Sequence, residues 1–187
     1  MNDIEPYKWL GVVALVTSWS AIILLLNRWD SDRTLSISHH AAKHKTGFLA
    51  MATLQSIACI SFILFGVKWM APTYELPLAF SVCFVVMALG LFVAAWVPTV
   101  EGIQRKVHNI SAYGATLLLL PTILLVATSP TISGVGKVAA YAAAMSMVLI
   151  FTVLLAAKRA KNNYLYLQCA YWLAFDIGLF TAAFVHP

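Results

Sequence analysis

Charged side chains are scarce in this sequence. Of 187 residues, 12 are Lys or Arg and 7 are Asp or Glu, so charged residues make up 10% of the chain. In soluble domains they make up about 25%. Hydrophobic residues make up 61%, which is more than a water-soluble fold of this size can bury. The scarcity of charge excludes a water-soluble domain and predicts a protein that lies in lipid.

The motifs of several common chemistries are missing as well. The chain has no G-x-G-x-x-G, no Walker loop, no C-x-x-C pair and no G-x-S-x-G elbow, so the corresponding nucleotide, redox and hydrolase sites are not indicated. No lysine lies deep in an apolar run, which argues against a retinal Schiff base. The three cysteines, Cys59, Cys83 and Cys169, all lie in apolar runs and predict buried thiols without a disulfide framework.

Six apolar runs are long enough to cross a bilayer, whose core of about 30 Å takes roughly 20 helical residues. They cover residues 9–26, 47–70, 77–97, 109–128, 138–156 and 164–184. The segments between them are short and carry nearly all the charge, and none has the composition of a linker. The sequence therefore predicts an all-α, polytopic integral membrane protein with one domain, a six-helix transmembrane bundle over residues 1–187.

Basic residues are concentrated in alternate connections between these runs. Nine of the twelve follow the first, third or fifth run, namely Arg28, Arg33, Lys43, Lys45, Arg105, Lys106, Lys158, Arg159 and Lys161. Because cytoplasmic connections are enriched in Lys and Arg, this distribution predicts three cytoplasmic connections and both termini outside. The net charge of +5 then reflects topology, so we expect no nucleic-acid partner. We expect a multi-pass protein of a prokaryotic plasma membrane.

Two histidines precede the second apolar run. Ser38 is a typical N-cap residue, so we expect a helix that begins near His39 and carries His40 and His44 on one face. The same face then bears Met51, Gln55 and Phe62. This spacing predicts a polar stripe that points into the bundle. The alternative is a solvated helix start whose histidines contact water, lipid phosphates or nearby acids.

A second polar segment, WVPTVEGIQRKVHNISAY, lies between the third and fourth runs. It carries Glu101, Arg105, Lys106, His108 and Asn109. If spans two, three and four are neighbours, Glu101 and His108 approach the first pair of histidines. His40, His44 and His108 would then suit zinc or another transition metal, or one haem between spans two and four. The alternative is that His108 orders a helix start while Arg105 and Lys106 contact lipid phosphates.

Asp176 is the one carboxylate well inside a predicted span, about 18 Å along the helix from Tyr164 at 1.5 Å per residue. Such residues are costly in lipid and usually face the bundle interior. We expect hydrogen bonding to a neighbouring span. The candidate partners are Ser18, Ser20, Tyr141 and Ser146. Two roles stay open: a proton relay or headgroup anchor, and a structural bond between helices.

Small residues repeat every four positions in the fifth span, at Gly136, Ala140 and Ala144. Small residues let helix backbones approach closely in lipid. This face is expected to pack within the bundle, and the alternative is a homo-oligomer or a partner membrane subunit.

The two polar segments resemble those of a known group of membrane proteins. The similarity rests on Trp96, Pro98, Glu101, His108, Asn109 and Ala112, and on RTLSISHHAA at residues 33–42. At these positions the chain resembles the six-helix proteins of domain-of-unknown-function family 998 and the related DRAM/Sfk-type proteins. The resemblance implies a six-span fold without an assigned reaction. The eukaryotic relatives of this family act in lipid handling and membrane trafficking, so the resemblance implies a lipid-related role.

We therefore expect a membrane protein, more plausibly not an enzyme, that binds or organises a lipid headgroup in a polar pocket at the basic side. The candidate ligand-binding residues are His40, His44, Gln55, Glu101, Arg105, His108, Asn109 and Asp176, with Lys106 as a further phosphate donor. One alternative is a metal- or haem-dependent membrane enzyme that uses the histidines. A second is an accessory subunit of a larger membrane complex.

Overall fold

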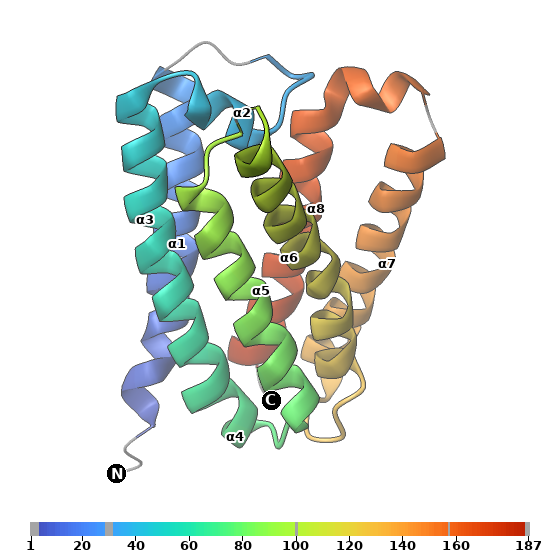
Figure 1. The fold of residues 1–187 in the computed structure, drawn as a ribbon. Helices are drawn as coiled ribbons and strands as arrows, with labels where there is room; N and C mark the ends of the chain where they lie inside the picture. The colour runs from blue at the N-terminus through green and yellow to red at the C-terminus, as the bar shows by residue number, and fades with distance from the viewer. Residues whose placement is uncertain (1–3, 29–31, 100, 157, 186–187) are drawn as a thin grey trace.

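The computed structural model describes residues 4–28, 32–99, 101–156 and 158–185, which form helices and connections without a β-strand (Figure 1). The long helices are α1 (Glu5–Arg28), α3 (Lys45–Leu64), α5 (Leu78–Trp96), α6 (Ile103–Ala127), α7 (Gly134–Ala156) and α8 (Tyr164–Phe184). The short ones are α2 (Ile37–Ala42) and α4 (Ala71–Thr73). A π-helical turn, Phe65–Met70, joins α3 to α4, and a 3₁₀ turn, Lys158–Asn163, precedes α8.

Six helical segments within the described part of the chain are long and apolar enough to cross a membrane, and α3 to α4 count as one of them. The all-α, six-helix prediction is confirmed. Several helices begin before their apolar run, because helical hydrogen bonding continues over the polar residues at the bundle's ends. The largest difference is in α6, which begins at Ile103 instead of 109. The orientation in the membrane stays a prediction, since the structure contains no bilayer.

The two ends of the bundle carry different connections. Figure 1 shows α2, the α5–α6 connection and the α7–α8 connection at one end, while α1 begins and α8 ends at the other. We call the first the basic end because the described residues Arg33, Lys43, Lys45, Arg105 and Lys106 belong to it. We call the second the terminal end. Any function that uses the two polar segments therefore belongs to the basic end.

Aromatic rings fill the terminal half of the bundle. Phe65, at the start of the π-helical turn, is stacked on Phe180 of α8, with ring centroids 5.6 Å apart and an interplanar angle of 1°. Phe62 is stacked on Phe84 of α5 at 5.3 Å. Phe65 and Phe84 belong to a large buried cluster that reaches α6, α7 and α8, and Phe62 and Phe180 pack against it.

The basic half is packed differently. Helix α2 lies across this end, where Ile37 and Ala41 pack with Ile22, Leu25 and Leu165 of the first and last spans. In Figure 1, α7 diverges from α6 toward this end. Residues 34–39, which include the start of α2, cover the site at this end, and we call them the roof. The roof and the divergence of α7 position the candidate site.

The small residues of the fifth span are buried inside the bundle. Ala140 and Ala144 are 0% and 3% exposed, and a Cβ on Gly136 would lie 3.1 Å from the Cα of Ala182 in α8. This close approach favours packing within the bundle. The role of this face in an oligomer or with a partner subunit stays a prediction.

Candidate functional site

A cavity of about 490 Å³ lies between α6, α7 and α8 at the basic end, beneath residues 34–39. We call it the basic-end cavity. Its polar lining comprises Thr34, Ser36, Ser38, His39, His108, Asn109, Thr116 and Gln168. Its apolar and aromatic lining includes Tyr113, Phe151, Leu154, Leu155, Tyr171 and Trp172. The hydrogen-bonding groups, which we call the polar wall, come from residues 34–39, α6 and α8, while the side toward α7, which we call the apolar wall, is lined by Phe151, Leu154 and Leu155.

The roof of this cavity is built around Ser36. Its Oγ accepts the backbone N–H of His39 at 3.3 Å and lies 2.6 Å from the Nδ1 of the same histidine. Ser36 is thus the N-cap of α2, and the prediction that Ser38 caps this helix is wrong. Ser38 lies two residues further along the chain, and its hydroxyl oxygen is 2.9 Å from that of Ser36. The chain enters α2 two residues earlier than predicted because Ile37 packs into the buried cluster below.

Two hydrogen bonds fasten the roof to α8. The backbone N–H of Ile37 donates to Oε1 of Gln168 at 3.2 Å, and the N–H of Leu165 donates to the carbonyl of Arg33 at 3.0 Å. Asp32, just before the roof, accepts the N–H and the hydroxyl of Thr34 at 2.8 and 2.7 Å, and these bonds lower the pKa of its carboxyl. Asp32 is thus bonded to Thr34 and does not line the cavity.

His108 lies inside α6 and not at its beginning, since that helix starts at Ile103. It is 4% exposed, and its Nδ1 lies 2.7 Å from the carbonyl oxygen of Val97. A carbonyl can only accept, so Nδ1 donates, and in the neutral ring Nε2 is then the acceptor. The bond satisfies a carbonyl at the C-terminal end of α5 that the helix itself leaves without a partner. Its neighbour Asn109 also lines the basic-end cavity.

The predicted stripe of His40 and His44 does not form. Helix α2 ends at Ala42, and α3 begins at Lys45 with His44 as its extended N-cap residue. The two histidines therefore belong to different helices and lose their one-turn spacing. His40 is 2% exposed, with Nε2 2.9 Å from the carbonyl of Asp32 and with Nδ1 buried and unpartnered among the described residues. His44 is exposed, and neither histidine lines the basic-end cavity.

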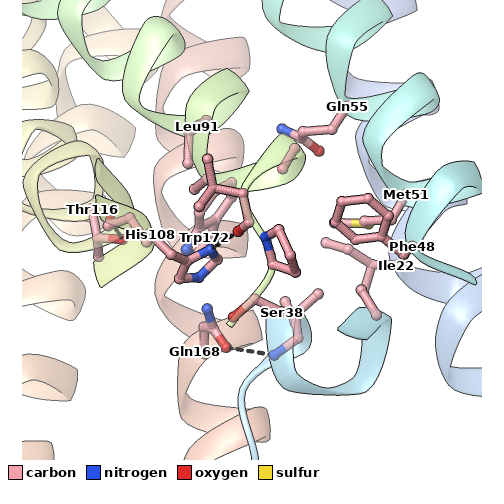
Figure 2. A pocket seen from close by; sticks show the side chains of 17 residues that line it. Ile22, Ser38, Phe48, Met51, Gln55, Leu91, His108, Thr116, Gln168 and Trp172 are labelled. Carbon is pink, nitrogen blue, oxygen red and sulfur yellow. Dashed lines mark hydrogen bonds between the residues drawn. The ribbon is translucent and has the colours of Figure 1, made fainter. Parts of the chain in front are cut away.

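Gln55 lines a second cavity, of about 90 Å³, which continues the first one inward. Figure 2 shows its amide reaching from α3 toward the space that His108 approaches from α6. The Oε1 of Gln55 accepts the hydroxyl of Ser18 at 3.3 Å. Met51, on the same face of α3, lines this cavity too. The lower part of the predicted stripe therefore does point into the bundle.

The charged residues of the second polar segment lie outside the cavity. Glu101, Arg105 and Lys106 are all exposed. Arg105 nevertheless acts on the site: the pKa of His39 is lowered first by burial and then by the positive charge of Arg105, with smaller effects from His108, His40 and Lys43. His39 thus lies near the positive charges of Arg105 and Lys43, a setting that favours an anion.

Among the described residues, no three His, Cys, Asp or Glu side chains are placed together to hold a metal ion. His40 is held under the roof, His44 is exposed at the start of α3, and His108 is bonded to Val97. The metal- or haem-dependent enzyme stays a prediction that these positions do not support.

Asp176 lies apart from the basic-end cavity, in a third cavity of about 30 Å³ deeper in the bundle. Its Oδ2 accepts the indole N–H of Trp19 in α1 at 2.7 Å. The predicted hydrogen bond to another span is thus present, but the partner is Trp19. Three of the four predicted partners, Ser20, Tyr141 and Ser146, are exposed and so lie on the outer surface. Ser18 lines the same cavity but bonds to Gln55.

Sequence reasoning missed His39, Gln168 and the place of Trp172 in the site. Gln168 and Trp172 lie four and eight residues after Tyr164, and all three line the basic-end cavity. The one available signal was this i, i+4 series on α8, which continues to Asp176. This series was hard to recognise as a polar face, because hydropathy counts the tryptophan in it as apolar.

The chain was compared with known proteins. No protein-family model matches it, and no curated protein or solved structure gives a significant match.

Proposed function

We propose that this integral membrane protein binds an anionic amphiphile, a lipid with a phosphate-bearing headgroup, in the basic-end cavity. The observation that supports this most directly is the mixed lining of the cavity, with hydrogen-bonding groups from residues 34–39, α6 and α8 and apolar side chains from α7. A molecule that satisfies both walls has a polar head and a hydrocarbon tail. The volume of about 490 Å³ falls in the usual range for small-molecule sites, about 300–1,000 Å³.

The polar wall suits an anion. It offers hydroxyls, two imidazoles and two amides, and no Asp or Glu belongs to the described lining. Hydrogen bonds in which one partner is charged are roughly twice as strong as neutral ones. Arg105 stands exposed outside the cavity and its charge already reaches His39. We assign the headgroup to His39, His108 and Asn109, with Arg105 and Lys106 attracting the phosphate from the surface.

The apolar wall suits an acyl chain. Tyr113 of α6 is 58% exposed, and Phe151 and Leu155 of α7 are 39% and 74% exposed. These residues line the cavity and at the same time belong to the outer surface of the bundle. A tail that lies between them remains in contact with bilayer lipid. The resemblance to six-helix proteins whose eukaryotic relatives act in lipid handling, carried by Trp96 and His108 among others, favours the same class of ligand.

The test is retention of anionic lipid by the purified full-length protein. The protein is exchanged into mixed micelles that contain phosphatidylglycerol and phosphatidylcholine, and the bound lipid is counted by native mass spectrometry. We expect preferential retention of phosphatidylglycerol. Replacement of His39 and Asn109 by alanine should weaken it by about tenfold, which equals about 1.4 kcal/mol. Equal retention of both lipids, or no loss in the double variant, would contradict the proposal.

His44→Ala is the matched control, since this histidine belongs to the same connection but does not line the cavity. It should retain phosphatidylglycerol like the unaltered protein. An equal loss in His44→Ala and in the double variant would indicate general surface attraction and no defined headgroup site.

A further inference from the structure

Three cavities follow one another along the inside of the bundle. The cavity of about 90 Å³ shares Ser38, His108, Ala112, Thr116, Gln168 and Trp172 with the basic-end cavity. It shares Gln55, Leu91 and Trp172 with the cavity of about 30 Å³ that contains Asp176. Trp172 thus lines all three. The series joins the polar wall at the basic end to a carboxyl group deep in the membrane span.

The surroundings of Asp176 contain little that compensates a negative charge. Besides α8, four helices line its cavity (α1, α3, α5 and α6), and the one titratable group that they contribute from the described residues is Cys59. None of them contributes a Lys, Arg, His or second acid there. The hydrogen bond from Trp19 occupies Oδ2. A carboxyl group in such a place lowers its burial cost by taking up a proton.

Trp172 supplies the second observation. Its indole Nε1 is buried and has no hydrogen-bond partner among the described residues. Buried donors are normally satisfied, by protein groups or by ordered water. A cavity holds a water molecule when it offers about 10–15 Å³ and two to four polar partners. Both inner cavities are larger than this, and Ser18, Gln55 and Asp176 supply acceptors beside the indole in the deeper one.

The series is closed toward the terminal end. Phe62 lines the cavity of Asp176 and lies beyond Gln55 and Cys59 toward the terminal end of α3. Phe62 is stacked on Phe84 at 5.3 Å, and Phe65 is stacked on Phe180 directly beyond. Water and protons thus have a polar route from the basic end and an aromatic barrier at the other.

We propose that Asp176 is a proton-binding site inside the membrane, which exchanges protons with the basic end alone through water held in the two inner cavities. Trp172 donates to this water at the point where the cavities meet. His108 and Gln168 form the entrance, since both line the wide cavity and the first inner one. The proton-binding site is distinct from the lipid site, because no residue assigned to the headgroup lines the cavity of Asp176, and the two share His108 at the entrance of the route.

The test is infrared spectroscopy of the full-length protein in nanodiscs. A protonated carboxyl group gives a C=O stretching band that shifts when D₂O replaces H₂O, and Asp176→Asn identifies the band by removing it. We expect this band to be present, to disappear as the pH is raised, and to shift in D₂O. If Asp176→Asn removes no such band at any pH at which the protein is folded, Asp176 is not a proton-binding site and the proposal is overturned.

The route is tested by the rate of the D₂O shift. Trp172→Phe keeps most of the ring and removes the N–H, so the exchange should slow by about tenfold. Ala112→Phe fills the passage between the wide and the inner cavity and should slow it as well. Leu117→Phe, on the same helix but 54% exposed on the outer surface, is the matched control and should leave the rate unchanged. Unchanged exchange in both cavity variants would overturn the route.

Discussion

The two ends of this bundle are packed in opposite ways. At the terminal end, a Cβ on Gly66 would lie 2.5 Å from the ring of Phe84, and one on Gly11 would lie 2.7 Å from the ring of Phe65. At the basic end, the wide cavity of about 490 Å³ separates α7 from α6 and α8. Helix association in lipid depends largely on close packing, because the hydrophobic effect does not drive one helix against another there. The terminal end therefore holds the helices together, and the basic end is left open for polar chemistry.

The largest effect should come from crowding the aromatic contacts of the terminal end. Gly66→Ala introduces a Cβ at 2.5 Å from Phe84, whose ring is fixed by its stack on Phe62. Overpacking of this kind costs about 1–3 kcal/mol. We expect a clear drop in the melting temperature of the detergent-solubilised protein, measured by circular dichroism. Gly114→Ala is the control, because nothing lies within 4 Å of its added Cβ. Equal melting temperatures for the two variants would show that the terminal end is not tightly packed.

A pair of substitutions on α6 compares the two ends directly. Ala127 is 0% exposed and belongs to the large buried cluster that contains Phe65 and Phe84. Ala112 lines the cavities of about 490 Å³ and about 90 Å³ near the basic end. Ala127→Leu should destabilise the protein by about 1–3 kcal/mol through overpacking. Ala112→Leu has a cavity to enter and should change stability by less than about 0.5 kcal/mol, but it should reduce the retention of phosphatidylglycerol. Similar destabilisation by both variants would contradict the contrast between the ends.

The bond between Trp19 and Asp176 lies between the two regions. Trp19→Phe keeps an aromatic ring but removes the donor to Oδ2. Hydrogen bonds between membrane helices are worth about 0.6 kcal/mol on average and about 1.7 kcal/mol at most. We expect a loss in that range in the free energy of unfolding, measured by denaturation with sodium dodecyl sulfate. Trp9→Phe, at a residue 62% exposed at the terminal end, should change it less. A larger loss in Trp9→Phe than in Trp19→Phe would refute the assignment.

The smallest effect should be a pH dependence from His39. Burial and the charge of Arg105 lower the pKa of this imidazole from its ordinary value of 6.5. The folded state therefore prefers the neutral ring, and this contribution to stability is present above pH 6.5 and is lost as the pH falls through the lowered pKa. We expect the melting temperature to fall from pH 7 to pH 5 and His39→Gln to reduce that fall. Phosphatidylglycerol should reduce it also, because an anion stabilises the protonated ring. An identical pH profile in His39→Gln would count against this role.

The spans were predictable because a helix that crosses the bilayer core needs about 20 apolar residues, and charged residues mark where each such run ends. The break between His40 and His44 was not predictable, since no Pro or Gly marks it. Helix α2 turns away from α3 because Ile37 and Ala41 find a buried place against α1 and α8, and such tertiary packing overrides local spacing. The partner of Asp176 was hidden for a similar reason. Trp19 lies in the first span, far from Asp176 in sequence. Its indole N–H is the polar part of a side chain that hydropathy counts as apolar.

The two bonds that fasten residues 33–37 to α8 determine how a molecule reaches the wide cavity. Arrival from the aqueous side between residues 33–37 and α8 would require the breaking of the Leu165 and Ile37 hydrogen bonds. Arrival from the side passes exposed side chains such as Tyr113 and Leu155, and the rotation of such side chains takes picoseconds to nanoseconds. Exchange of an occupant would then follow its two-dimensional concentration in the surrounding leaflet, and its solubility in water would have little influence on the rate.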